Sequence, residues 1–189
     1  MSRDFGSHKL RALERFEAIL RANLSTELDA VMDVGLYAPD PDTTTHFALL
    51  ANPTDLEDAF VNEDVAVYIF PAEPNTGVAD YSGGASVSRH QVEWPVAVHI
   101  RFSIPISDGF TAYGRTLTDA EKRSRIAMRY EQAIINCVDK YLENGDDVLQ
   151  VSGLVKNLID TEYNGESPAY GHVHTEWQIT QMVERYKTT

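Results

Sequence analysis

Two long segments of alternating polarity constrain the fold of this chain more than any other feature. Residues 91–105 and 171–186 largely alternate apolar with polar side chains, with Val173 and Trp177 in the apolar row of the second segment and His99 in the polar row of the first. Successive side chains of a strand point to opposite faces of a sheet. Each segment therefore predicts a long strand with one apolar and one polar face, which is typical of an antiparallel sheet.

Shorter strands are predicted around these two. The β-branched and aromatic run at 65–71 predicts a strand, and residues 43–51 favour a short one. Residues 148–160 are expected to be extended, with an interruption at Gly153. Pro95 cannot donate to a ladder, so it favours a sheet edge or a bulge at its position.

Two amphipathic helices complete the pattern. Apolar residues spaced by three and four over 7–31 form one stripe of a helix, with Ser7 as the expected N-cap residue. A second helix is expected from Thr118 to about Glu143, opened by a capping box of Thr118 and Glu121. Its expected inward residues are Ala120, Ala127, Tyr130, Ile134, Cys137 or Val138, and Tyr141.

The remaining segments carry weaker signals. Residues 54–61 favour a short helix, whereas 72–90 and 106–117 are small, polar and glycine-containing and are predicted as extended loops. No linker or repeat divides the chain. We therefore predict one domain over 1–189 with an α+β fold: a single, mostly antiparallel sheet, two long helices packed on one face, and a long hairpin loop.

The net charge of −13 is concentrated in one third of the chain. Between Arg21 and Arg89 there are 12 acidic residues and no Lys or Arg, so the rest of the chain has 17 acidic and 16 basic residues. Phosphate binding needs the opposite balance. Two interpretations stay open: a solvated acidic face, or a surface that repels an anion.

Little in the sequence points to an enzyme. Nucleophile-elbow, phosphate-loop and dinucleotide patterns are missing. The lone Cys137 falls on the expected inward side of a helix, where an inert thiol is usual. No apolar leader or membrane-length run is present, so we expect neither a secretory signal nor a membrane partner. We expect a protein without enzymatic activity or a cofactor.

One pattern of possible metal ligands supports an alternative, enzymatic function. His172, His174 and Glu176 share a face of the last predicted strand, where they could converge on zinc or iron, and His99 on a neighbouring strand could add a ligand. This would make the chain a metal-dependent small-molecule enzyme. Polar residues on the solvated face of an alternating strand are, however, the ordinary arrangement.

The predicted loops hold residue types that are enriched at protein interfaces. Tyr and Arg there favour contacts with a partner, although long loops without a partner are also common. The candidate interface residues are Tyr81, Arg89, Phe110, Tyr113 and Arg115.

The order of these elements resembles the tail terminator, or tail-completion, proteins of tailed bacteriophages. The matching segments are the helix Leu10–Val31, the strands Val65–Pro71 and Gln91–Pro105, the helix Leu117–Glu143 and the strand Gly171–Tyr186. The resemblance covers most of the chain and is one of pattern and length, without a diagnostic motif. Stoppers and connector adaptors, which are other neck components, resemble it as well.

The resemblance implies a virion protein that is assembled in the host cytoplasm. A homo-oligomeric, hexameric ring would cap the tail tube, end its polymerisation and join it to the head-side connector or stopper, while DNA passes through without specific binding. An anionic lumen fits such passage because it repels phosphates. The residues expected to line or border the lumen are Asp40, Asp42, Asp55, Glu57, Asp58, Glu63 and Asp64.

Overall fold

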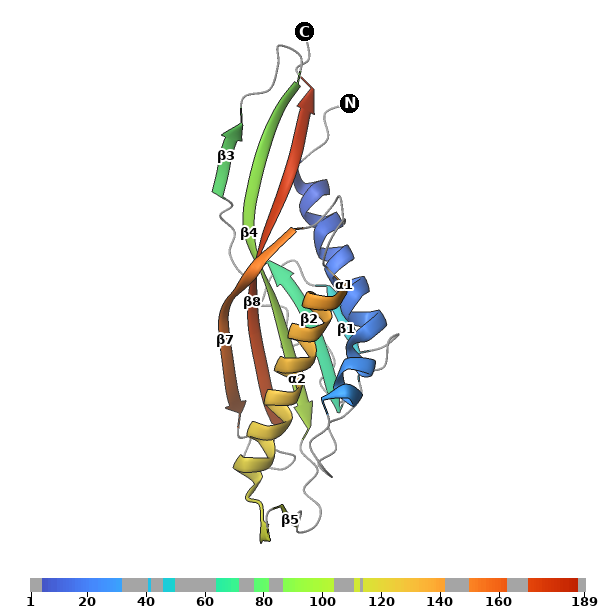
Figure 1. Cartoon of the computed structure of the whole chain (residues 1–189), viewed down its shortest axis with the longest axis vertical. Coiled ribbons are helices and arrows are strands. Elements are labelled where there is room, and N and C mark those ends of the chain that lie inside the picture. Colours follow the sequence, from blue (N-terminus) through green and yellow to red (C-terminus); the bar gives the residue numbers. More distant parts are fainter. Residues whose placement is uncertain are drawn as a thin grey trace.

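The chain folds into one long sheet with both helices on the same face (Figure 1). The computed structural model describes residues 5–31, 41, 46–49, 64–71, 77–81, 87–103, 111–112, 114–141, 150–162 and 170–186. The helices are α1 (Phe5–Ala30) and α2 (Asp119–Tyr141). The strands are β1 (Phe47–Leu49), β2 (Val65–Pro71), β3 (Gly77–Tyr81), β4 (Val87–Ser103), β5 (Thr111–Ala112), β6 (Arg115–Thr116), β7 (Gln150–Glu162) and β8 (Tyr170–Tyr186).

Six of these strands form a mixed sheet in the order β1-β2-β4-β8-β7, with β3 beside the first part of β4. β1 and β2 are parallel, and all other neighbours in the sheet are antiparallel. The longest ladder joins β4 to β8, from Val87 opposite Tyr186 to Ser103 opposite Tyr170. β5 and β6 form a separate hairpin, which turns at Gly114 with a φ of 76°. The predicted α+β fold with a mostly antiparallel sheet is confirmed.

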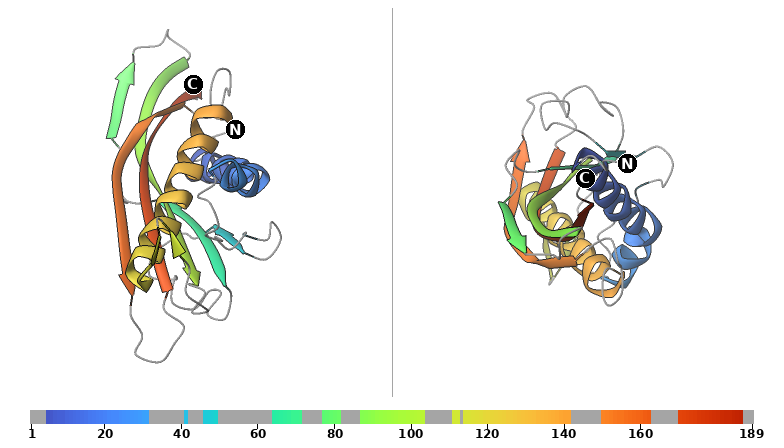
Figure 2. Two further views of the ribbon diagram at one scale, coloured as in Figure 1. Left: turned by 60° about the horizontal axis from the view of Figure 1, so that its bottom comes forward. Right: turned by 90° about the horizontal axis from the view of Figure 1, so that it is seen from above.

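The main core lies between the helices and one face of the sheet (Figure 2). The strands contribute alternate residues to it, among them Val98, Ile100 and Phe102 of β4, as their polarity pattern predicted. Phe102 is fully buried, and its ring centroid lies 5.2 Å from that of Tyr130 in α2. It also lies over Gly171, its partner in β8, where a Cβ atom would clash with the ring.

The two helices are also joined by polar contacts. Arg129 of α2 donates from Nε to the carbonyl of Val31 (2.9 Å) and from Nη2 to that of Leu28 (3.2 Å), at the C-terminal end of α1. Such carbonyls have no partner within the helix, so a cation there stabilises the helix end. Glu27 is 2% exposed and accepts hydrogen bonds from Lys140 Nζ (2.6 Å) and Tyr141 Oη (3.1 Å).

Pro95 lies in a central strand, at a position that acts as a local edge. On one side of β4, pairing with β2 stops where Pro71 faces Val96, and pairing with β3 starts where Gly77 faces Glu93. Position 95 falls in the gap, so β4 has a neighbour there only in β8 among the described strands. A residue without an N–H group is tolerated at such a position.

Two loop predictions are wrong in part. Within 72–90, β3 covers Gly77–Tyr81 and β4 already begins at Val87. This stretch is poor in aliphatic residues, so it carries no hydrophobic signal, yet the backbone can still pair along β8. Within 106–117, the described residues include the short strands β5 and β6.

Details of both helices also differ from expectation. α1 begins at Phe5, so Ser7 lies inside the helix and is not its N-cap residue. In α2, Ala120 is exposed and Tyr141 is 39% exposed, because the buried stripe runs instead from Lys122 and Arg123 through Ile126 to Val138. The predicted interruption of β7 is confirmed by register shifts on either side of Gly153. The short helix predicted at 54–61 lies outside the described residues.

Candidate functional site

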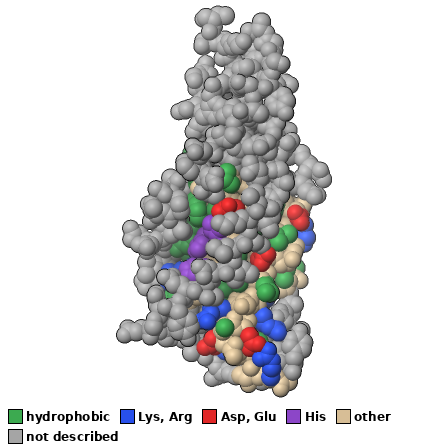
Figure 3. All heavy atoms as spheres, turned by 90° about the vertical axis from the view of Figure 1, so that its left-hand side faces the viewer, with side chains coloured by type: hydrophobic (Ala, Val, Ile, Leu, Met, Phe, Trp, Pro, Cys, Tyr) green, Lys and Arg blue, Asp and Glu red, His purple; other side chains and the backbone are tan. Residues whose placement is uncertain are grey.

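The polar residues singled out in the sequence come together on the sheet face that is turned away from the helices. Cross-strand partners lie side by side on one face of a sheet. In β2, β4 and β8, one such row is Tyr68–His99–His174. The adjacent rows are Ala66–Arg101–His172 and Phe70–Ala97–Glu176. We call these nine residues the histidine face, and its histidines are visible in Figure 3.

The three histidines contact one another. His99 Nε2 lies 3.0 Å from His172 Nδ1, so one of these nitrogens donates and the other accepts, according to the tautomers. The ring centroid of His99 is 5.1 Å from that of His172 and 5.9 Å from that of His174. His174 Nε2 in turn lies 3.1 Å from Glu176 Oε1.

Buried apolar side chains flank these histidines. Ala66, Tyr68, Phe70 and Ala97 form a small cluster, separate from the main core, in which Tyr68 is 1% exposed. Burial raises the pKa of the Tyr68 hydroxyl, although the neighbouring Arg101 lowers it in part. Desolvation therefore keeps this phenol neutral.

Charged groups border the face at its end near residue 170. The Arg101 guanidinium lies 3.9 Å from the centre of the Tyr170 ring, a cation–π contact. The register of β7 places Asp160 opposite His172, Leu158 opposite His174 and Lys156 opposite Glu176. β7 is thus the neighbour of β8 on the side away from β4.

His172, His174 and Glu176 lie on one face of β8, and His99 of the neighbouring strand β4 lies beside both histidines. A metal centre does not follow from it. Among the described residues, no group of three or more His, Cys, Asp or Glu side chains is arranged to hold a metal ion. Two of the candidate ligands, His174 and Glu176, are hydrogen-bonded to each other. What the arrangement offers is one hydrogen bond between two imidazoles and one between an imidazole and a carboxylate.

Sequence reasoning missed the aromatic and cationic partners of this face. Tyr68, Arg101 and Tyr170 occur in strands whose pattern is explained by alternation alone, so nothing local marked them. The register of the strands is the signal that could have found them, because it places Tyr68 opposite His99 and Tyr170 opposite Ser103.

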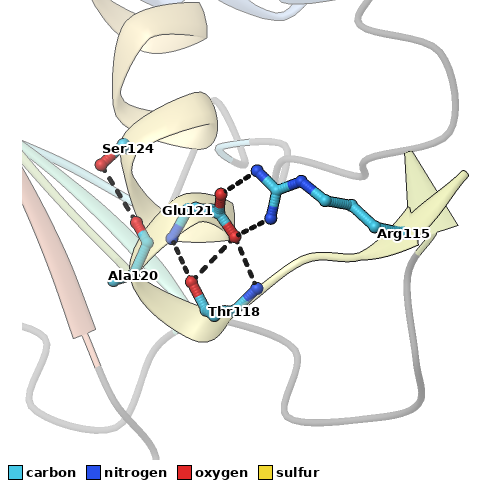
Figure 4. A network of polar contacts seen from close by, with 5 residues as sticks. All are labelled: Arg115, Thr118, Ala120, Glu121 and Ser124. Atoms are coloured by element: carbon cyan, nitrogen blue, oxygen red, sulfur yellow. Dashed lines mark hydrogen bonds and ion pairs between the residues drawn. The ribbon is translucent and has the colours of Figure 1, made fainter. Parts of the chain in front are cut away.

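Three of the five candidate interface residues are described, and they lie in two separate pairs of strands. Tyr81 in β3 and Arg89 in β4 are direct partners in the ladder. Arg115 in β6 forms two contacts with the Glu121 carboxylate, one of them 3.0 Å long (Figure 4). Phe110 and Tyr113 lie outside the described residues.

Glu121 is the centre of this second network. Besides Arg115, it accepts from the backbone N–H of Thr118 (2.9 Å), while Thr118 Oγ1 accepts from the N–H of Glu121 (3.3 Å), which confirms the predicted capping box (Figure 4). Arg115 first, and then Thr118, lower the pKa of Glu121 to about 2. Arg115 therefore fixes the β5–β6 hairpin against the start of α2.

Of the acidic residues proposed to line a channel, only Asp64 is described. It is exposed directly before β2, where its Oδ1 accepts from Ser103 Oγ (3.0 Å) and its carbonyl from Ser103 N (2.6 Å). The other six, Asp40, Asp42, Asp55, Glu57, Asp58 and Glu63, lie outside the described residues.

Cys137 is fully buried in α2, as its position in the sequence predicted. Burial raises the pKa of its thiol to about 12, so the thiolate is not formed at neutral pH. This cysteine belongs to the core.

No family model matches the chain, and neither does any curated protein. In the described part of the chain, neither helix has the length and apolar character needed to cross a membrane.

Proposed function

We propose that this chain is a structural protein of a phage virion, a tail terminator that assembles into a homo-oligomeric ring, caps the tail tube and joins it to the head-side connector. Its element order, which resembles that family, supports the proposal. The proposed role is mechanical and involves neither catalysis nor a cofactor.

The observation that carries the proposal is that the sheet ends in two different strands. β7 runs from Gln150 to Glu162 and pairs only with β8 among the described strands, while β1 at the other end pairs only with β2. An unpaired strand edge is a template for pairing with another chain. Two unlike edges permit a head-to-tail contact, and such contacts form a ring where the rotation between neighbours closes.

Charge supports the same proposal. The acidic third of the chain would repel DNA phosphates from a ring that DNA must pass. Within this proposal, Tyr81, Arg89, Phe110, Tyr113 and Arg115 contribute contacts to neighbours. The acidic residues proposed to line or border the lumen are Asp40, Asp42, Asp55, Glu57, Asp58, Glu63 and Asp64.

The first test is the mass of the purified protein. We expect native mass spectrometry and light scattering to show a ring-sized oligomer, with a hexamer as the expected species, and negative-stain images to show a central opening. A monomer at all accessible concentrations, both alone and with purified tail tubes, would contradict the proposal.

A second test separates the terminator from other neck components. A terminator binds the end of tail tubes and limits their length, whereas a stopper or connector adaptor binds the head-side ring. Co-sedimentation with each assembly distinguishes the two. Tail-tube and head-completion genes beside this one would support either.

Metal analysis addresses the enzyme alternative: stoichiometric zinc or iron on His172, His174 and Glu176 would favour it over a structural role.

A further inference from the structure

The two strands at the ends of the sheet, β1 and β7, run in opposite directions. β1 is parallel to β2, β4 runs opposite to β2, β8 opposite to β4, and β7 opposite to β8. When copies of the chain stand side by side in the same orientation, as in a ring, the β1 edge of one copy therefore meets the β7 edge of the next as an antiparallel pair. Such a contact has the geometry of most pairings within the sheet itself.

β7 offers a regular edge over only part of its length. Its register with β8 shifts between Val151 and Gly153 and again between Leu154 and Lys156, whereas the residues from Lys156 to Glu162 pair with β8 one after another. Register shifts bend a strand and interrupt the even row of N–H and C=O groups that a further strand needs. The part of β7 that can accept another strand is therefore its second half.

β1 lies in the same rows of the sheet as this regular half. Ladder partners followed across β2, β4 and β8 place Phe47 in the row of Ile159, Ala48 in that of Leu158 and Leu49 in that of Asn157. Neighbours in a ring are related by rotation alone, so equal heights meet where the strands follow the ring axis. In that arrangement, β1 of one copy faces residues 157–159 of the next.

We propose that β1 of one copy pairs antiparallel with residues 157–159 of β7 in the neighbouring copy, so that the sheet continues across the subunit boundary. This inference rests on the proposed ring and names the surface through which its subunits meet. β1 has only three residues, but it is held from behind: Phe47 is buried in the main core, and the Arg21 guanidinium of α1 lies 5.0 Å from the centre of its ring. An edge that is already in place loses little freedom on association.

The test places one cysteine in each edge of the full chain. Directly opposite Cα atoms of an antiparallel pair are about 4.5–5.5 Å apart, which a disulfide can span. Within one chain, the two edges are four strand spacings apart, about 19 Å, so only a bond between copies can form. We expect Leu49→Cys with Asn157→Cys, or Ala48→Cys with Leu158→Cys, to give a ladder of covalent oligomers under mild oxidation, ending at the mass of the ring. Two adjacent rows are tested because side chains come closer in only one of them.

The matched control combines Leu49→Cys with Ser152→Cys, because Ser152 lies at the first register shift of β7. It should form no ladder, and neither should the wild type, whose Cys137 is buried. Double variants that form rings in native mass spectrometry but no ladder in either row would overturn the inference and leave the proposed function standing. An equal ladder in the control would also overturn it. A wild type that stays monomeric would contradict both proposals.

A second measurement uses the wild-type ring and decides the case of a cysteine variant that does not assemble. In an edge strand, amides bonded to the inner neighbour alternate with amides that point outward. Pairing across the boundary protects both kinds, so we expect slow hydrogen exchange at every amide of residues 157–159 and fast exchange at outward amides of residues 150–155. Alternating protection through 157–159 in an assembled ring would overturn the inference.

Discussion

The two faces of the sheet are built from the same strands and differ in what fixes them. On the helix-covered face, β4 presents Val98, Ile100 and Phe102, all fully buried against two helices. On the histidine face, the intervening positions hold His99 and Arg101, half-buried and joined to neighbours by directional contacts. The helix-covered face is stabilised by buried apolar area and close packing, which are insensitive to pH. The histidine face combines a small buried apolar cluster with hydrogen bonds and charges, which depend on pH.

The largest effect is expected on the helix-covered face. Phe102→Ala removes a fully buried ring that contacts Tyr130 of α2, and leaves a cavity between helix and sheet. We expect the free energy of unfolding to fall by about 3–5 kcal/mol, measured by urea denaturation. A loss below about 1 kcal/mol would show that this face is not the tightly packed one.

A second substitution tests how tightly that face is packed. Gly171→Ala places a Cβ atom against the Phe102 ring, and we expect a cost of about 1–3 kcal/mol from overpacking. In a Phe102→Leu background the ring is gone, so the same change should cost much less. The double-mutant cycle measures this coupling. Additive effects would mean that Phe102 does not lie over Gly171.

A polar contact joins the two helices on the helix-covered side of the sheet, which is otherwise mostly apolar. Glu27→Gln weakens its contacts with Lys140 and Tyr141, and we expect a loss of about 1–2 kcal/mol at pH 7. The hydrogen bond from Lys140 lowers the pKa of Glu27 below its ordinary value of 4.5. A carboxyl with a lowered pKa stabilises the fold above that value and stops doing so as pH falls through its folded pKa. The difference between variant and wild type should therefore shrink below about pH 4.5, and a constant difference would contradict the ion pair.

The smallest effect is expected on the histidine face. Tyr68→Phe removes a buried hydroxyl that hydrogen-bonds with Arg101 and keeps the ring. We expect a loss of about 0.5–1.5 kcal/mol in urea denaturation at neutral pH. Phe70→Tyr, two residues further along β2 and on the same face, is the matched control for adding rather than removing a hydroxyl. No change in Tyr68→Phe would indicate that the hydroxyl adds no net stability there.

The elements that sequence analysis found are those with a local pattern. The strands at 65–71, 91–105 and 171–186 and both helices follow from periodicity, and the capping box of Thr118 and Glu121 follows from spacing. Each of these signals lies within one segment of the chain, so a single sequence is sufficient to read it.

What sequence analysis could not find depends on pairing between distant segments. The first part of β4 becomes a strand through its register with the end of β8. His99 and His172 are 73 positions apart and meet diagonally across that ladder, which no local pattern specifies. The parallel pairing of β1 with β2 likewise has no local signature. Sharing a face can be predicted from alternation, whereas contact requires the register.

The long ladder between β4 and β8 has a consequence for biosynthesis. Val87 pairs with Tyr186, and Ser103 pairs with Tyr170. β4 therefore leaves the ribosome well before β8, the strand that flanks it along its full length, has been synthesised. Closing such distant segments is slow compared with forming a helix. We expect the nascent chain to pair β2 with β4 and form α2 first, and to expose one side of β4 until translation of β8 is finished, a period in which chaperones would find a binding site.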